Sequence, residues 1–162
     1  MKNKFEIKYE VSAGGIVYKK VRDLRSKILD LRWLICQHSQ HKGWVFPKGL
    51  IGDKDSKESM EVAALREVEE EGGVKAKIVN KQPIKVQYQY RFPTSAKATV
   101  GKKDQLIKKT VYYFLMEYIS GDPKNHDWEV SEAKFIPEPE VKKILTYNSD
   151  KQAFEKALDF LD

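Results

Sequence analysis

Cysteine is almost absent from this 162-residue chain, and Cys36 is the only one. A single cysteine excludes an intramolecular disulfide and a zinc site built from cysteines. Cys36 ends the apolar run that begins at Trp33, and free cysteines in such surroundings are usually buried. We therefore expect an inert thiol here rather than a nucleophile.

Long apolar runs are also missing. No segment approaches the roughly 18 apolar residues that a membrane-spanning helix requires. Residues 1–10 are charged from the second position onward and lack the apolar core of a signal peptide. We expect a cytoplasmic protein without a membrane partner. Internal repeats, low-complexity tracts and interdomain linkers are absent, which predicts one domain over residues 1–162. No pattern indicates an oligomeric state.

Charge is abundant but unevenly distributed. The hydrophobic content of 41% and the charged content of 33% are typical of a folded globular protein. The net charge is +6, yet residues 49–74 hold eight acidic and three basic side chains. That stretch has a net charge of −5, so the remainder carries +11. A basic body around an acidic patch suggests an anionic substrate bridged by metal ions, although basic charge alone also suits nonspecific nucleic-acid binding.

The hydrophobic pattern predicts a mixed α/β fold of the α+β type with a core built largely from strands. Strands are expected at Glu6–Tyr18, Leu31–Gln37, Lys75–Asn80, Ile84–Phe92, Thr110–Tyr118 and Phe135–Ile136. Two polar connections are expected, a hairpin over Lys19–Asp30 and a loop over Pro93–Lys108. Two helices are expected near the C-terminus, at Glu138–Leu145 and Asp150–Leu161.

The acidic patch itself predicts a helix. Either Ser56 or Ser59 is a suitable N-cap, and Gly72-Gly73 is suited to end the helix in the left-handed conformation. At about 100° per residue, the aliphatic side chains should face the core and the glutamates the opposite side, with small alanines between them. The aliphatic set is Val62, Leu65 and Val68; the glutamates are Glu67, Glu70 and Glu71; the alanines are Ala63 and Ala64.

The glutamate stripe is costly without a counter-charge. Like charges three or four residues apart destabilise a helix by a few tenths of a kcal/mol per pair. An acidic helix is ordinarily a solvated face, but a divalent cation is the simplest reason to tolerate this spacing. Mg²⁺ prefers oxygen ligands, so glutamates rather than histidine or cysteine are the suitable residues.

The spacing Gly52-x5-Glu58-x7-Arg66-Glu67-Val68-x-Glu70-Glu71-x-Gly73-Val74 resembles the signature of the Nudix hydrolases, G-x5-E-x7-R-E-U-x-E-E-x-G-U, where U is a bulky aliphatic residue. The segment from Trp44 to Gly49 is similar to the one that leads into this box in Nudix enzymes acting on diadenosine polyphosphates. The later segments 109–115 and 128–154 are similar as well, so nearly the whole chain is covered. The resemblance implies a mixed sheet sandwiched between helices.

One departure concerns the first glycine of the box. In relatives, the glycine of Pro-Lys-Gly lies six residues before the first glutamate, whereas Gly49 lies nine residues before Glu58. Either Gly52 takes the role of that glycine, or three residues are inserted between Leu50 and Lys57, which we favour. The backbone metal ligand expected at Gly49 depends on this choice.

The resemblance implies hydrolysis of a nucleoside diphosphate linked to another group, with Mg²⁺ or Mn²⁺ as cofactor. Glu67, Glu70 and Glu71 are the implied metal ligands, and one of them is also the general base. Glu58 and Arg66 are implied to support them, Arg66 through an ion pair. Glu129 matches a later carboxylate that approaches the metal from across the site.

Substrate contacts are expected outside the box. Lys48, Lys109 and His41 are candidate phosphate ligands. Tyr88 and Tyr90 lie where the diadenosine-polyphosphate group places a tyrosine that stacks on adenine or contacts phosphate. Ordinary packing is a competing explanation for the tyrosines, and solvent contact for His41. The two tryptophans nearest these residues, Trp44 and Trp128, are expected to be core anchors rather than platforms for a base.

These residues favour asymmetric hydrolysis of diadenosine tetraphosphate to ATP and AMP. Alternatives are removal of pyrophosphate from an RNA 5′ end, cleavage of a nucleoside or deoxynucleoside triphosphate, and a catalytically silent Nudix domain that senses a ligand. The last alternative predicts lost box glutamates, and none is lost.

Overall fold

The computed structural model describes residues 5–92 and 104–162. Its elements, in chain order, are β1 (Phe5–Arg22), β2 (Leu29–His38), β3 (Trp44–Val45), β4 (Lys48–Leu50), α1 (Met60–Gly72), β5 (Val74–Ile78), β6 (Ile84–Phe92), β7 (Asp104–Gly121), the 3-10 helix η1 (Pro123–Asn125), β8 (Val130–Pro137), α2 (Glu138–Ile144) and α3 (Asn148–Asp159). None of the helices in these ranges is long and apolar enough to cross a membrane.

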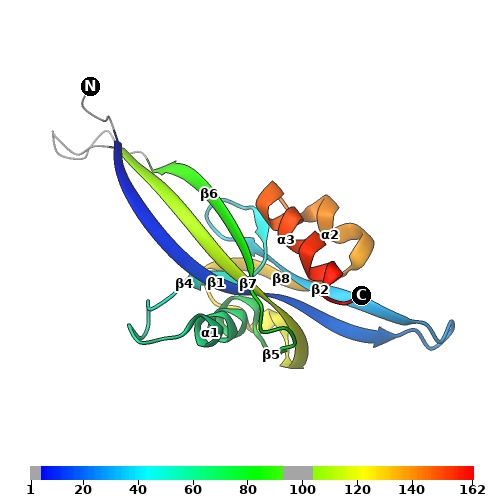
Figure 1. Ribbon diagram of the computed structural model, residues 1–162. Coiled ribbons are helices and arrows are strands. Elements are labelled where there is room, and N and C mark those ends of the chain that lie inside the picture. Colours follow the sequence, from blue (N-terminus) through cyan, green and yellow to red (C-terminus); the bar gives the residue numbers. More distant parts are fainter. Residues whose placement is uncertain (1–4, 93–103) are drawn as a thin grey trace.

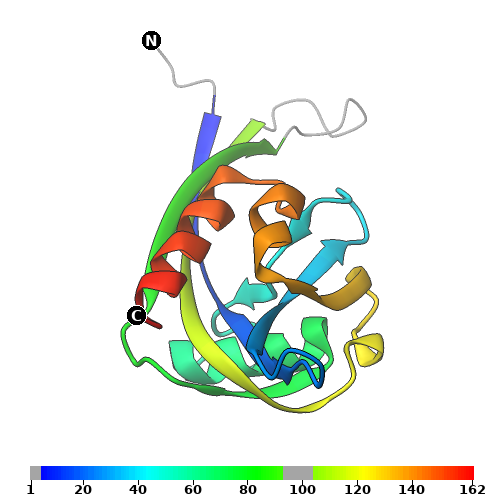
Figure 2. The same ribbon diagram turned by 90° about the vertical axis from the view of Figure 1, so that its right-hand side faces the viewer.

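A mixed eight-stranded sheet forms the centre of the fold, with the path β3-β2-β1-β7-β5. Strand β4 pairs with β1, β6 with β7, and β8 with β2. The long strands β1 and β7 run parallel, from Phe5 opposite Asp104 to Tyr18 opposite Glu117. Figures 1 and 2 show α1 on one side of this sheet and α2 and α3 on the other.

The core is divided between the two faces of the sheet because successive strand residues point to opposite sides. On one face, Trp33 and Tyr113 pack against Phe154 of α3, with the Trp33 and Phe154 rings at 4.9 Å in a T-shaped arrangement. On the other, Ala13 and Val17 of β1 pack against α1. The predicted α+β class, a mixed sheet between helices, is confirmed.

Most predicted elements are present, with longer strands than expected. β1 continues to Arg22, and β7 begins at Asp104, so the expected polar loop over Pro93–Lys108 is wrong for its last five residues. All five residues pair with β1, and residues 105–108 pair with β6 as well, so strand pairing outweighs their polar composition. The other residues of that expected loop, 93–103, lie outside the described ranges.

Helix α1 begins and ends as predicted, and Val68 and Leu65 contact the core as expected, but the rest of its core face differs from the prediction. The Ser59 hydroxyl accepts a hydrogen bond from the Val62 N–H at 3.2 Å, and Gly73 ends the helix at φ 71°. Val62, however, is 55% exposed. The buried positions are Ala63, Ala64, Glu67, Val68, Glu71 and Gly72. Small residues let the helix approach the sheet closely, which places two of the glutamates at the interface instead of in solvent.

Candidate active site

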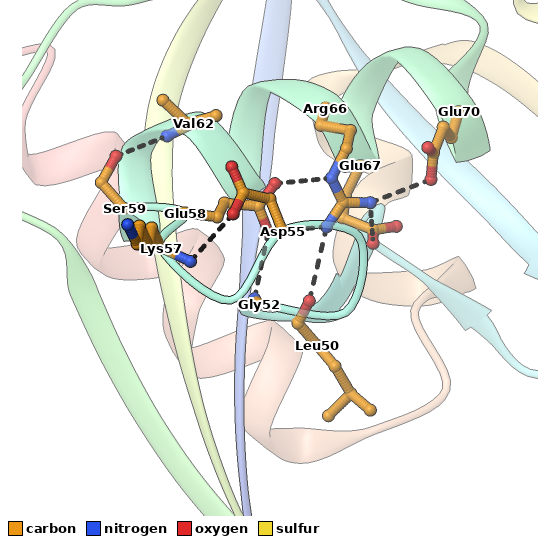
Figure 3. A network of polar contacts seen from close by, with 10 residues as sticks. All are labelled: Leu50, Gly52, Asp55, Lys57, Glu58, Ser59, Val62, Arg66, Glu67 and Glu70. Carbon is orange, nitrogen blue, oxygen red and sulfur yellow. Dashed lines mark hydrogen bonds and ion pairs between the residues drawn. The ribbon is translucent and has the colours of Figure 1, made fainter.

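Arg66 joins three of the box glutamates in one network (Figure 3). Its Nε and Nη2 donate to the two carboxylate oxygens of Glu58 at 2.7 and 3.0 Å. Its Nη1 donates to Glu67 at 2.8 Å and to Glu70 at 3.1 Å. Nη2 also reaches the Leu50 carbonyl at 3.4 Å. The expected ion pair with a neighbouring glutamate is present, and it extends to two further carboxylates.

Both carboxylate oxygens of Glu58 accept hydrogen bonds from the protein. Its side chain is 3% exposed, and its Oε1 accepts a further hydrogen bond from the Gly52 N–H at 3.1 Å. Hydrogen bonds from Arg66 are the main reason that the pKa of Glu58 lies below its usual value. A carboxylate held this way stabilises Arg66 and the loop before α1 and is poorly placed to bind a metal ion.

Gly49 and Gly52 are the two candidates for the first box glycine, and each lies at a position that suits glycine. Gly52 has φ 81°, which favours glycine, and its N–H anchors Glu58. Gly49 lies against Glu67: a Cβ added to Gly49 would come within 2.1 Å of Glu67 Oε1. Gly52 therefore lies in the loop before α1, while Gly49 of the Pro-Lys-Gly segment lies beside α1; the three-residue insertion stays a prediction.

Glu67 and Glu71 are buried carboxylates, 5% and 6% exposed. Burial raises the pKa of Glu67 to about 7, although hydrogen bonding to Arg66 opposes the rise. Burial raises the pKa of Glu71 to about 8, opposed by the Lys48 backbone N–H, which donates to its Oε2 at 3.0 Å. Taking a carboxylate out of water disfavours its charged form. These two groups would gain most from a nearby cation.

Glu70 and Glu129 complete the acidic group from two elements. The Glu70 side chain is 36% exposed and contacts Arg66, and its carbonyl accepts the Asp127 N–H at 2.8 Å. Asp127 belongs to the segment between η1 and β8, which also contains Glu129. The charge of Glu129 contributes to the raised pKa of both Glu67 and Glu71, so this carboxylate lies near enough to both to interact with them electrostatically.

The residues present suit a divalent cation of the magnesium type. Within residues 5–92 and 104–162, no three His, Cys, Asp or Glu side chains are already gathered at metal-binding positions. Glu67 and Glu70, two of the four implied metal ligands, instead contact Arg66. The donor set is nevertheless all oxygen, and two of its carboxylates are buried with raised pKa values. Hard cations such as Mg²⁺ and Mn²⁺ prefer this set. Glu67, Glu70, Glu71 and Glu129 would hold the ion.

The expected phosphate ligands Lys48 and Lys109 lie on the sheet face opposite α1. Lys109 of β7 is opposite Tyr88 of β6 and Glu10 of β1, and residues paired in this way share a face. Lys48 is opposite Gly14 of β1, on the same face as Glu10. Burial, and then the charge of Lys48, lowers the pKa of Lys109. In the described chain neither lysine has a carboxylate partner within 4 Å, so both amino groups can bind an anion.

Tyr88 and Tyr90 form a stacked pair on this face, with ring centroids 6.3 Å apart and planes 30° apart. Tyr88 is half-buried against the core, whereas Tyr90 is 40% exposed. Tyr88 thus packs on the core, as the packing explanation expects, while Tyr90 presents a ring to solvent, and its contact with a base stays a prediction.

His41 stacks on His38 at 4.1 Å in the loop before β3. Its Nδ1 accepts the Gly43 N–H at 3.0 Å and lies 3.2 Å from the Tyr147 hydroxyl. Burial, and then the charges of His38 and Lys48, lowers the pKa of His41. Because Nδ1 is an acceptor, the neutral ring carries its proton on Nε2, where it can donate to a phosphate.

Sequence reasoning missed several residues of this face. Tyr113 donates to Asp150 at 2.8 Å between β7 and α3, and burial raises the pKa of Asp150. Tyr147 contacts His41 although 106 residues separate them. The Ser12 hydroxyl is buried without a hydrogen-bond partner in the described chain. Spacing does not reveal such long-range pairs, but a serine in an expected strand, two residues before Gly14-Gly15, was a usable signal for Ser12.

A family profile for the NUDIX domain matches residues 21–157. The chain belongs to the NUDIX family. Nudix hydrolases generally use divalent metals, in agreement with the carboxylates of α1. The predicted family and fold are thereby confirmed.

Among curated relatives, the Nudix chain is 28% identical over 155 residues to MutT4 of Mycobacterium tuberculosis, described as a candidate mutator protein. The match covers 95% of this chain and 56% of the relative, so the chain spans little more than half of that protein.

Solved structures share the fold at low identity. The Caenorhabditis elegans Ap4A hydrolase binary complex has a TM-score of 0.56 at 22% identity, over 94% of this chain and 97% of that one. The Escherichia coli dihydroneopterin triphosphate pyrophosphohydrolase has a TM-score of 0.60 at 19% identity, over 91% and 95%. The NUDIX domain of Shewanella oneidensis NrtR, complexed with ADP ribose, has a TM-score of 0.57 at 19% identity, over 100% and 94%.

Proposed function

We propose that this Nudix chain hydrolyses a dinucleoside polyphosphate in a magnesium-dependent reaction, with diadenosine tetraphosphate cleaved asymmetrically to ATP and AMP. The observation that carries the proposal is a face on which Lys109 lies opposite Tyr88, joined through Lys48 to the buried Glu71; in the described ranges neither lysine has a carboxylate partner. Lys48 makes the link directly, since its backbone N–H binds Glu71 while its side chain lies on the face of Lys109 and Tyr88.

The substrate would lie across β4. Its phosphates would contact Lys48, Lys109 and the Nε2–H of His41, and one adenine would stack against Tyr90. A base stacked on an aromatic side chain contributes about 1–3 kcal/mol. The lysine charges would offset the repulsion between a polyphosphate chain and the acidic face of α1.

Hydrolysis places a water oxygen on a terminal phosphorus of the chain and breaks its anhydride bond to the departing ATP. A divalent cation supplies charge neutralisation and a lowered pKa of bound water when it is present. One of Glu67, Glu70 and Glu71 accepts the proton of the water. Arg66 positions Glu67 and Glu70, and the Lys48 N–H positions Glu71, so each candidate base is held by a hydrogen bond.

A second candidate function is cleavage of a nucleoside or deoxynucleoside triphosphate. Similarity to MutT4, described as a candidate mutator protein, favours it. A triphosphate would use the same lysines but only one base-binding position.

Steady-state kinetics with Mg²⁺ on four substrates separates these functions: diadenosine tetraphosphate, ATP, oxidised dGTP and triphosphorylated RNA. We expect the highest kcat/KM for diadenosine tetraphosphate, with ATP and AMP in equal amounts. A higher kcat/KM for any triphosphate or for RNA would refute the substrate while leaving the hydrolase class intact.

A further inference from the structure

Trp128 is exposed, contrary to the prediction from the sequence. It was predicted to anchor the core, but it is 77% exposed, whereas Trp33 is fully buried and Trp44 is partly buried against the core. A large aromatic ring left in water forgoes the most favourable burial available to any side chain. An exposed tryptophan beside a candidate active site therefore suggests a ligand that covers it.

The segment that presents Trp128 is fixed to the catalytic helix. The Asp127 N–H donates to the Glu70 carbonyl at 2.8 Å, and the Glu129 N–H donates to Asp127 Oδ1 at 3.1 Å. The Glu129 carbonyl in turn accepts the Ser39 N–H at 2.9 Å. The backbone on both sides of Trp128 is thus held in place, one residue from the contact with Glu70. A ring on such a segment is preorganised for binding.

In the order of strands across the sheet, the segment of Trp128 and the strand of the tyrosine pair lie on opposite sides of β1 and β4. Across the sheet, β6 with Tyr88 and Tyr90 pairs with β7, and β8, which follows Trp128, pairs with β2. Strand β1 lies between these pairs and carries β4, which contacts Glu67 and Glu71. A polyphosphate chain that crosses β4 would therefore have an aromatic ring at each end.

The charges around Trp128 indicate the kind of occupant. Its chain neighbours are Asp127 and Glu129, both acidic. An RNA backbone would be repelled here, because surfaces that follow phosphate backbones carry lysine and arginine. A single neutral base at the end of a short substrate would not be repelled.

We propose that Trp128 stacks on the second nucleobase of a dinucleoside polyphosphate, the base farther from Tyr90. This inference rests on the proposed function and goes beyond it, because it assigns a binding position that a mononucleotide does not use. Trp128 takes no part in the chemical step.

The kinetic test compares two substrates that differ only in the second nucleoside, diadenosine tetraphosphate and adenosine 5′-tetraphosphate. For W128A we expect KM for diadenosine tetraphosphate to rise about tenfold with kcat unchanged, and KM for adenosine 5′-tetraphosphate to change less than about twofold. W128F, which keeps a ring, should recover most of the loss. Equal effects on both substrates, or no effect on either, would overturn the inference.

A binding test without turnover uses a methylene-bridged analogue of diadenosine tetraphosphate and the fluorescence of the three tryptophans. Quenching is expected in the wild type and in W44F and should be lost in W128F. Quenching without turnover of diadenosine tetraphosphate would refute the proposed function alone. Turnover with quenching that persists in W128F would refute the Trp128 position alone, and absence of both turnover and quenching would refute both.

Discussion

Replacing Glu71 with glutamine should stabilise the metal-free protein at neutral and alkaline pH. Glu71 has a pKa of about 8 in the folded chain, because it is buried, and an ordinary value of 4.5 when exposed. Between these values the folded state binds a proton that the unfolded state lacks. The free energy of unfolding therefore falls as pH rises from about 4.5 to 8.

The size of this loss follows from the pKa difference. One pKa unit corresponds to about 1.4 kcal/mol, and local relaxation around the carboxylate reduces the total, so we expect a loss of about 2 kcal/mol by pH 8. Glutamine keeps the shape and can still accept the Lys48 N–H, but it carries no charge. In EDTA at pH 8, E71Q should melt about 4–8 °C above the wild type, and near pH 4.5 the two should coincide.

With Mg²⁺ bound, the wild type should melt above E71Q, the reverse of their order in EDTA. Mg²⁺ at 100 times its dissociation constant would stabilise the wild type by about 2.7 kcal/mol, and E71Q should respond much less. E69Q is the matched control, because Glu69 lies on the exposed side of the same helix. Equal melting temperatures of E71Q and the wild type in EDTA at pH 8 would refute the proposed cost of the buried charge. Equal stabilisation of both by Mg²⁺ would refute Glu71 as a metal ligand.

Three further substitutions test the site. R66A should lower the free energy of unfolding by about 3 kcal/mol in urea titrations and abolish turnover, because it leaves the buried Glu58 carboxylate unpaired. G49A should reduce kcat about 100-fold with little change in secondary structure by circular dichroism, since its Cβ would displace the Glu67 carboxylate. K109A should raise KM for the polyphosphate about tenfold with a smaller effect on kcat, because a charge-assisted contact to phosphate is lost.

Neighbouring residues provide controls for two of these variants. L50A changes the exposed side chain next to Gly49 and should leave kcat within about twofold of the wild type. K108A removes the adjacent lysine, whose amino group lies 6.0 Å from the Tyr9 ring on the other face of the sheet. A rise in KM for K108A as large as that for K109A would refute a local phosphate contact and indicate a general effect of charge.

The local part of the site was predictable because its spacing is set within one helix and the loop before it. Glu70 lies four residues after Arg66, so its contact with the guanidinium follows from helical geometry. Glu67 is the next residue in the chain, and its contact with Arg66 does not follow from that spacing. The caps at Ser59 and Gly73 were predictable for the same reason.

The face of α1 was mispredicted in part because bulky side chains alone were taken to mark the core; this holds for Val68 but not for Val62. Val62 is exposed, while Ala63 and Ala64 are fully buried. The helix approaches the sheet so closely that a Cβ on Gly15 would come within 2.5 Å of Val68 Cγ2. Such contact selects small residues, a preference that hydrophobic periodicity does not register.

The substrate face was only partly predictable because strand register brings its residues together. Lys109 lies opposite Glu10 only through the parallel pairing of β1 and β7, which are far apart in the sequence. Trp128 was mispredicted because its exposure follows from the tethered segment before β8, and no local pattern indicates that tether.

The most direct test of the central claim is the product analysis of diadenosine tetraphosphate with and without Mg²⁺, for the wild type and E71Q. The wild type should release ATP and AMP in equal amounts with Mg²⁺ and nothing in EDTA, and E71Q should release neither under either condition. Release of two ADP molecules, turnover in EDTA, or full activity of E71Q would contradict a metal-dependent asymmetric hydrolase built on the glutamates of α1.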